Sequence, residues 1–480
     1  MSINATGLTV PTEPKHDGQV DPEHLLPDSD SLFGDPDESF GREHSPEPVI
    51  IPPHHNDPTY GLQWVRHGGG FSVHPEWTVQ PSIESIILTL EKVVDPNKTF
   101  RVHHHWDGAM SKIYFVSYDH ERLVLRVFLP VCPKTKTESE VATLRWTNEN
   151  TRLPVPKVRC YDSTRENPIG FEWILMERME GKPLFECWDS VTHGAKERIV
   201  KQIADYAARI FNNQFRGIGN IYPTKSHHIS GHQPPVGEMA SMRRLRLISA
   251  DLRVMAQEST HEAHQTTATN MMDLVDRLRA LEDDFFPSPP SHPGQASVYE
   301  DDESTDDDGY EQATKKLDKY YEPTMLWHDN ISLDNILVDE NGILCGVVDW
   351  ACVCCIPLYE ACQFPTFLQQ AFDRLNEPFT PHRVTREQGD ISSDVARYKK
   401  ELMQYQLTSL RQLFLDEMSY LCPGWVETFR DQADLRDYEV AVQNCNDETS
   451  YKIVEEWLDN FEKRGDSDHP RWHLHERIML

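Results

Sequence analysis

Apolar residues along the chain fall into two patterns, and the order of these patterns predicts a mixed α and β protein. Three segments have the composition of short strands: 113–118, 123–128 and 173–177. Between the second and the third, ESEVATLRWTNENT (138–151) has a helical pattern, and the extended, proline-containing LPVPKVRCYD (153–162) follows it. Two strands, a helix and a returning strand therefore predict a small α+β unit.

Helical spacing dominates the chain on both sides of this unit. Ahead of it, Ser82 is a suitable N-cap for a helix whose apolar residues share one face. Beyond Gly181, apolar stripes with helical spacing lie in four segments: 199–211, about 235–286, 398–413 and 451–461. The third stripe is formed by Tyr398, Leu402, Tyr405, Leu410 and Leu413. The second half of the chain is therefore expected to be mainly helical.

Two parts of the chain have the composition of disordered sequence. Residues 1–78 are rich in proline, charged residues and serine, and their apolar residues have no sustained period, which predicts a disordered arm. Gly68, Gly69 and Gly70 fit a linker within it. The segment 287–318 is proline-rich and has seven acidic residues between Glu300 and Asp308, which predicts a disordered insertion.

Composition and charge exclude several classes of protein. The 78 acidic residues outnumber the 47 basic ones, so the formal net charge of −31 disfavours binding to nucleic acid. No apolar run approaches the about 18 residues of a membrane span, and the N-terminus has no secretory signal pattern. The ten cysteines are therefore expected to be reduced, in the cytoplasm or the nucleus. Cys352, Cys354 and Cys355 fit structural positions better than a metal site, as do the histidines 103–105.

The strongest chemical signal is ILVDENGILCGVVDW, at 336–350. Segments 336–339 and 343–349 have strand character, and the turn residues between them predict a hairpin. Folding about that turn brings Asn335 beside Asp349. An amide oxygen and a carboxylate are hard ligands that suit Mg²⁺. An ordinary hairpin whose polar flanks cap loops explains the same spacing.

The segment from His328 to Asp349 resembles the catalytic and metal loops of the aminoglycoside phosphotransferase and choline kinase branch of the protein-kinase-like superfamily. That family has H-x-D-x-x-x-x-N, a short hairpin and I-I-D-W, and a large fungal group of such domains is similar. His328 matches the leading His, and Asn335 and Asp349 match the two metal ligands. The resemblance implies a two-lobed fold, with a β-rich N-lobe (79–180) and a helical C-lobe (181–480) that holds the hairpin at 326–350.

The upstream half of the chain agrees with this resemblance. By the resemblance, Arg126 takes the place of the phosphate-contacting cation, and Glu140 is the acid that pairs with it. An ordinary surface arginine at a strand edge is the alternative for Arg126. Backbone groups around Glu177 and Met179 correspond to the adenine-binding hinge. The segment WDGAMSK replaces the glycine-rich flap, with its residues nearest the phosphates being Gly108, Ser111 and Lys112.

One position departs from the family pattern. Counting back from Asn335, the catalytic aspartate is replaced by Asn330, and the neighbouring carboxylate is Asp329. An amide can orient a hydroxyl group, but it does not take its proton as a carboxylate does. Three interpretations remain open: a shifted loop that presents Asp329, slow catalysis by metal and positioning, and nucleotide binding without turnover.

The resemblance implies an ATP- and Mg²⁺-dependent phosphotransferase that acts on a hydroxyl group of a small molecule, with no binding of nucleic acid or membrane. It does not identify the acceptor as an aminoglycoside. The rival hypothesis is a weak or inactive pseudokinase that serves as a nucleotide-binding or interaction module. In that case the acidic insertion and the N-terminal arm would recruit protein partners.

Overall fold

The computed structural model describes residues 59–66, 73–223, 229–231, 262–286, 323–369, 391–447, 449–463 and 472–474. Most of the predicted disordered arm and the whole acidic segment 287–318 lie outside the described residues. The first part of the helical pattern expected from residue 235 also lies outside them. The predicted disorder of these segments remains a prediction.

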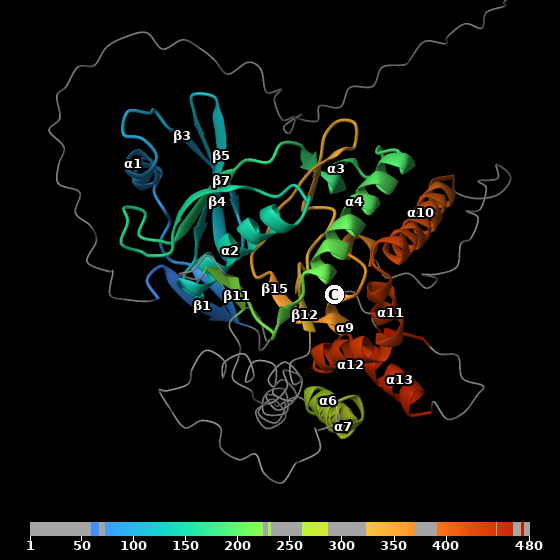
Figure 1. The fold of residues 1–480 in the computed structure, drawn as a ribbon. Coiled ribbons are helices and arrows are strands. Elements are labelled where there is room, and N and C mark those ends of the chain that lie inside the picture. The colour runs from blue at the N-terminus through green and yellow to red at the C-terminus, as the bar shows by residue number, and fades with distance from the viewer. Residues whose placement is uncertain are drawn as a thin grey trace, which may run out of the picture. The chain divides into compact units, whose positions relative to one another are not determined.

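A five-stranded antiparallel sheet forms the N-terminal part of the fold, in the order β3-β4-β5-β7-β6. Strands β3, β4, β5 and β7 are labelled in Figure 1. Its strands are β3 (Arg101–Asp107), β4 (Ser111–Tyr118), β5 (Glu121–Phe128), β6 (Val158–Asp162) and β7 (Trp173–Glu177). The three predicted strands are confirmed as β4, β5 and β7. Along β5, Leu123, Leu125 and Val127 pack into one core, and Phe128 packs into another. Side chains therefore alternate between two covered faces, and Arg126 emerges on the Phe128 face.

Each face of this sheet is covered by its own helix. Helix α1 (Ile83–Val93) begins at Ser82, whose hydroxyl oxygen accepts a hydrogen bond from the Ser85 N–H, as the N-cap pattern predicts. Its residue Leu90 is buried in the same core as Leu125. Helix α2 (Thr135–Asn150) covers the opposite face, where Val141 packs with Phe128. Arg126 and α2 consequently lie on the same side of the sheet.

Two strands lie within the segment that the sequence predicts to be disordered. Strands β1 (Leu62–Arg66) and β2 (Val73–Trp77) form an antiparallel pair, so the prediction for residues 1–78 is wrong for these positions. Trp77 packs edge-on against Phe171, with ring centroids 5.1 Å apart. The Phe171 ring also lies against Gly61, where an added Cβ would be 2.5 Å from the ring. The aromatic partner is distant in the sequence, which is why the local pattern does not reveal this pair.

Among the described residues, the helical part contains two hydrophobic cores. The first includes residues from α3 (Leu184–Cys187), α4 (His193–Asn212), α9 (Leu358–Ala361), η1 (Thr366–Leu368), α10 (Ile391–Leu421) and α11 (Pro423–Asp431). The second joins residues from α6 (Glu262–Ala280), α12 (Ala433–Asn444) and α13 (Tyr451–Glu462), with α7 (Glu282–Phe285) against it. A sheet followed by helices confirms the predicted α+β class.

The predicted stripe on α10 is only partly correct. Tyr405, which belongs to that stripe, is 41% exposed. The core-facing residues of this helix are instead Leu407, Leu410, Phe414 and Met418, spaced by three or four positions. The long helix has apolar residues on more than one face, so its buried face cannot be chosen without its neighbour α4.

Short strands position the loop that precedes the predicted hairpin. Strand β12 (Pro323–Trp327) pairs with β15 (Cys354–Pro357) and β9 (Phe215–Arg216). Strand β13 (Ile336–Val338) pairs with β14 (Leu344–Val347) and β8 (Lys182–Pro183). The hairpin is confirmed, although β14 ends two residues earlier than predicted. A further short pair is formed by β10 (Ile221–Pro223) and β11 (Ile229–Gly231).

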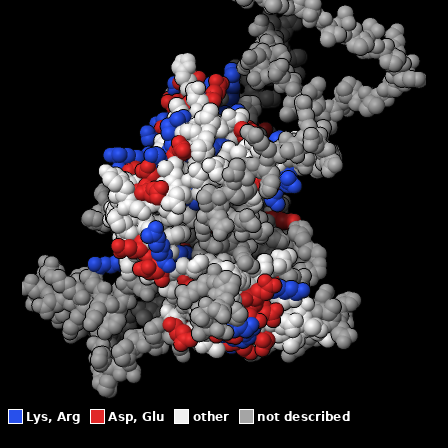
Figure 2. Space-filling model, turned by 90° about the vertical axis from the view of Figure 1, so that its right-hand side faces the viewer, with Lys and Arg blue, Asp and Glu red and all other residues white. Residues whose placement is uncertain are grey.

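Among the described residues, no helix combines the length and the apolar character needed to span a membrane. Acidic and basic side chains are interspersed over the face of the molecule drawn in Figure 2.

Gly181 allows the chain to pass directly from β7 to the hairpin. Its φ of +101° is a conformation that side chains disfavour, and an added Cβ would lie 2.7 Å from the Val338 carbonyl oxygen. Gly181→Ala is therefore expected to lower the free energy of unfolding by about 2 kcal/mol or more. Urea denaturation measures this change.

Gly194→Ala is the matched control, because a Cβ at this position in α4 meets no atom within 4 Å. Its stability is expected to be unchanged or raised by up to about 1 kcal/mol. Equal destabilisation by the two substitutions would contradict the steric argument for Gly181.

Candidate functional site

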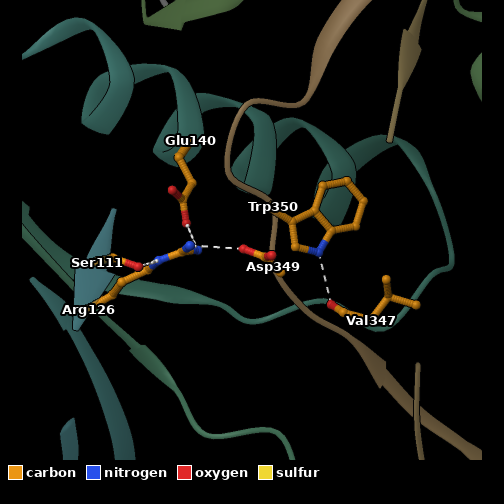
Figure 3. Close-up of polar contacts among 6 residues, drawn as sticks. All are labelled: Ser111, Arg126, Glu140, Val347, Asp349 and Trp350. Carbon is orange, nitrogen blue, oxygen red and sulfur yellow. Dashed lines mark hydrogen bonds and ion pairs between the residues drawn. The ribbon is translucent and has the colours of Figure 1, made fainter. Parts of the chain in front are cut away.

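Arg126 joins three separate elements through its guanidinium group (Figure 3). From strand β5, Nε donates to the Ser111 hydroxyl oxygen at 3.0 Å. Nη1 donates to Oε1 of Glu140 on α2 at 3.0 Å, and Nη2 donates to Oδ1 of Asp349 at 2.9 Å. The structure thus brings together four of the residues that the sequence singles out.

Burial determines the electrostatics of this cluster. The Glu140 side chain is 2% exposed and that of Arg126 13%, whereas that of Asp349 is 43% exposed. Burial disfavours the charged form of Arg126, but the carboxylates of Glu140 and Asp349 more than offset it and raise its pKa. Burial also raises the pKa of Glu140. The inner pair is therefore enclosed, and the outer carboxylate stays open to a ligand.

The hairpin places Asn335 and Asp349 side by side. The N–H of Val348, directly before Asp349, donates to the Asn335 carbonyl at 3.0 Å. The side-chain nitrogen of Asn335 donates to the Asn330 carbonyl at 3.0 Å, which leaves its amide oxygen for other ligands. An amide oxygen and a partly exposed carboxylate fit the oxygen donors that Mg²⁺ requires.

Trp350 fixes the backbone at the end of the hairpin. Its indole N–H donates to the Val347 carbonyl at 2.9 Å, and its ring is 1% exposed (Figure 3). Asp349, the preceding residue, has a φ of +64°, in the left-handed region that non-glycine residues rarely adopt. The buried indole therefore holds the backbone in a turn that presents Asp349 toward Arg126.

The loop 328–335 enters the hairpin from β12. His328 is 2% exposed, its Nδ1 accepts the Asn330 N–H at 3.2 Å, and its ring packs edge-on against Trp350 at 4.7 Å. Burial lowers the pKa of His328 to about 4, although the Asp349 carboxylate acts in the opposite direction. A neutral, buried imidazole orders this loop and does not reach the solvent.

Asp329 and Asn330 are both exposed, but their groups have different interactions. Burial raises the pKa of Asp329, and the Asp349 carboxylate adds to the increase, so these two carboxylates interact. The Asp329 carbonyl accepts a hydrogen bond from the Thr366 hydroxyl at 2.6 Å. The Asn330 backbone N–H and carbonyl are both used to order the loop. The structure therefore links Asp329 electrostatically to the candidate metal ligand.

The expected hinge is a narrow connection between the sheet and the hairpin. The Glu177 N–H donates to the Lys157 carbonyl at 2.9 Å, so this backbone donor is already occupied. Met179 lies directly against Gly346 of β14, where an added Cβ would be 2.6 Å from its Cε. The hinge thus passes over the strand that leads to Asp349.

Lys112 does not join the Arg126 cluster. Because neighbouring side chains in a strand point to opposite faces, Ser111 reaches Arg126 while Lys112 points the other way. The Lys112 ammonium instead pairs with Asp107 and lies 5.2 Å from the Trp77 ring centroid. Gly108 closes the turn between β3 and β4, where its N–H donates to the Ser111 carbonyl at 2.8 Å. The expected phosphate contact of Lys112 has no support in this geometry.

The cysteines 352–355 and the histidines 103–105, for which the sequence favours a structural role over a metal site, have ordinary structural surroundings with one exception. Burial raises the pKa of Cys354 to about 11 and that of Cys355 to about 12. Cys352 is exposed, whereas a structural cysteine is expected to be buried or half-buried, and it has a φ of +64°. His105 stacks on Phe115 at the exposed sheet edge.

Two contributors to the site are absent from the sequence prediction. Thr366 of η1 contacts the loop 328–335 at the Asp329 carbonyl, and no local pattern marks it. Lys136 lies in the first turn of α2, one turn before Glu140, and its ammonium is buried on the Arg126 side of the sheet. Its spacing of four residues from Glu140 is a signal that could have identified it.

Comparison with known proteins supplies a family for this site. A model of the phosphotransferase enzyme family matches residues 102–360, which contain Arg126, Glu140, Asn335 and Asp349. A subtelomeric hrmA-associated cluster protein of Aspergillus fumigatus is 37% identical over 135 residues, 28% of this chain and 26% of that protein. Altered inheritance of mitochondria protein 9 of Zygosaccharomyces rouxii is 29% identical over 154 residues, 29% of this chain and 25% of that protein. The matches thus span about a quarter of each curated relative.

Solved structures of aminoglycoside phosphotransferases are similar at low identity. The crystal structure of aminoglycoside phosphotransferase APH(4)-Ia has a TM-score of 0.36 and 15% identity, covering 72% of this chain and 99% of that one. A thermostable mutant of the same enzyme, in a ternary complex with AMP-PNP and hygromycin B, has a TM-score of 0.36 and covers 76% of this chain and 99% of that one.

The buried His328 predicts a pH dependence of stability. Its pKa is 6.5 in the unfolded chain and about 4 in the folded protein, so only the unfolded state binds its proton between these values. The stabilisation is complete above pH 6.5 and is lost as the pH falls toward 4, by about 3 kcal/mol. His328→Gln removes this titration. The difference in unfolding free energy between wild type and variant should therefore shrink by about 3 kcal/mol from pH 7 to pH 4.

His120→Gln, in the exposed turn after β4, provides the control. Its difference from the wild type should stay constant over the same pH range. Parallel stability curves for wild type and His328→Gln would rule out the buried neutral imidazole.

Proposed function

The chain belongs to the phosphotransferase enzyme family, and from this premise we propose that it transfers the terminal phosphoryl group of ATP to a hydroxyl group of a small molecule. The observation that carries the proposal is the linkage of Arg126 to both Glu140 and Asp349. A cation held by one enclosed carboxylate and one open carboxylate is suited to the phosphates of a metal-bound nucleotide.

Each part of the site has a role in this reaction. Arg126 binds the phosphates with its guanidinium, and Glu140 holds it in position. Asn335 and Asp349 are the residues that would hold Mg²⁺, which neutralises charge on the phosphates when bound. Backbone groups around Glu177 and Met179 flank the adenine side. Positioning and charge neutralisation supply most of the catalysis in such a site.

We assign the general base to Asp329, in preference to Asn330. A carboxylate can take the proton of the acceptor hydroxyl, whereas an amide cannot. As the hydroxyl oxygen forms its bond to the γ-phosphorus, the bond from that phosphorus to the β–γ bridging oxygen breaks, and ADP leaves. The raised pKa of Asp329 makes it a stronger base than an ordinary aspartate. Asn330 then orders the loop through its backbone contacts.

The acceptor is proposed only by class, as a small molecule with a hydroxyl group. A cytoplasmic location remains a prediction, since the yeast relatives are named as mitochondrial. Recruitment of protein partners by the acidic segment also remains a prediction, because that segment lies outside the described residues.

ATP binding should depend on Arg126. ATP with Mg²⁺ is expected to raise the melting temperature of the wild type, and the double variant R126M/E140Q is expected to bind ATP at least about tenfold more weakly. Changing both residues avoids a lone buried carboxylate. Isothermal titration calorimetry measures the affinity.

Arg122→Met is the matched control, since this arginine lies on the same strand but is 66% exposed. It should bind ATP like the wild type. No binding of ATP by the wild type would exclude the proposed function.

Turnover should depend on Asp329. Asp329→Asn is expected to lower kcat by about 10²- to 10⁴-fold with little change in ATP affinity, because it removes the proton acceptor. Asn330→Ala should retain kcat within about tenfold. Single-turnover transfer of the phosphoryl group from ATP, to water or to an acceptor found by a metabolite screen, measures the rate for both variants.

The acid limb of the pH profile gives a second readout. Activity should fall as the pH drops through a value above the ordinary 3.8 of an aspartate, because protonated Asp329 cannot accept a proton. Loss of turnover in Asn330→Ala but not in Asp329→Asn would reverse the assignment. ATP binding with no turnover in any form would favour the pseudokinase hypothesis.

A further inference from the structure

A second cation lies beside Arg126 and has no counterpart in the roles assigned above. Lys136 is in the first turn of α2, and its Nζ is buried without a hydrogen-bond partner among the described residues. Nζ lies 5.5 Å from the Phe128 ring centroid, and the Arg126 guanidinium carbon also lies 5.5 Å from that ring. Two positive groups thus converge on one aromatic ring from β5 and α2.

The charges around Lys136 are unbalanced. Burial lowers its pKa, and the neighbouring Arg126 lowers it further, while Cys352, Glu140 and Asp349 act in the opposite direction. Both carboxylates that flank this region already bind Arg126. An ammonium removed from water without a hydrogen-bonded partner is unfavourable, and a nearby cation adds repulsion. An anion placed between the two cations would relieve both costs.

We propose that Lys136 is a second phosphate-binding residue, which donates to the phosphate chain of a nucleoside triphosphate alongside Arg126. This inference rests on the proposed function and deepens it. The spacing supports it: Lys136 and Glu140 are one helical turn apart, so one face of α2 supplies both the new cation and the acid that holds Arg126.

The neighbours of Lys136 indicate which end of the nucleotide it meets. Its ammonium interacts with the candidate metal ligand Asp349 and with Cys352, three residues further along the chain. Lys136 therefore lies on the metal side of Arg126. Its contribution should grow with the number of phosphates and vanish for adenosine.

Lys136→Met tests this role, because methionine keeps an apolar stem against Phe128 and removes the charge. ATP affinity is expected to fall about tenfold or more, ADP affinity less, and adenosine affinity not at all. Lys136→Arg should restore most of the ATP affinity. Lys134→Met, two residues earlier and exposed, is the matched control and should bind all three ligands like the wild type. Calorimetry on the full chain, with and without Mg²⁺, gives the affinities.

Each outcome decides the proposal. Equal ATP affinity in wild type and Lys136→Met would overturn it, because the ammonium would then serve only to pack on Phe128. A matching loss of adenosine affinity would also overturn it, since adenosine has no phosphate to lose. If the wild type binds no ATP, the proposed function fails. Inorganic tripolyphosphate then decides the role of Lys136: weaker binding by Lys136→Met supports it, and unchanged or absent binding overturns it.

Discussion

The site depends on the three hydrogen bonds of Arg126, because no other described side chain at the site joins the sheet, α2 and the hairpin at once. Arg126 and Asp349 are 223 positions apart in the sequence, yet their side chains meet at 2.9 Å. Glu140 is enclosed, so it needs a charged partner to remain buried as a carboxylate. This requirement holds Nη1 of Arg126 against the buried Glu140 carboxylate. Nη2 of the same guanidinium then lies on the more exposed side, where the Asp349 carboxylate accepts its hydrogen bond.

The second constraint is the indole of Trp350, which sets the backbone that carries Asp349. Its N–H is used within the hairpin, and its ring packs against His328 and Tyr206. The position of the candidate metal ligand Asp349 and that of the loop 328–335 therefore both depend on this buried ring. A positive φ at Asp349 costs of order 1–3 kcal/mol and persists only where packing enforces it. The position of the polar Asp349 side chain is thus determined by the packing of the buried Trp350 ring.

The sequence predicts well whatever depends on near neighbours. The N-cap at Ser82 and the hairpin before Asp349 follow from local residue types, and the structure confirms them. It predicts poorly whatever depends on a distant partner. Lys112 and Ser111 are adjacent and must face opposite ways, but only the position of Arg126 across the sheet decides which one faces the site.

The same limit applies to elements as well as to single residues. The β1–β2 pair packs against Phe171 through the partly buried Trp77, and the buried face of α10 is selected by its contact with α4. Family resemblance locates Arg126, Glu140 and Asp349 because it carries information about distant contacts that composition and periodicity lack.

Charge around the site explains why nucleotide and metal would have to bind together. The site contains two cations, Arg126 and Lys136, and three carboxylates, Glu140, Asp329 and Asp349, which gives a net charge of −1 when all are ionised. A triphosphate alone would meet Asp329 and Asp349 at the open end and be repelled. A divalent cation held by Asn335 and Asp349 would reverse the local sign, and the proposed roles of Lys136 and Arg126 would then place the phosphates beside it. The net charge of the molecule as a whole therefore says little about this site, where the local charge would be set by five side chains and by the metal that two residues could hold.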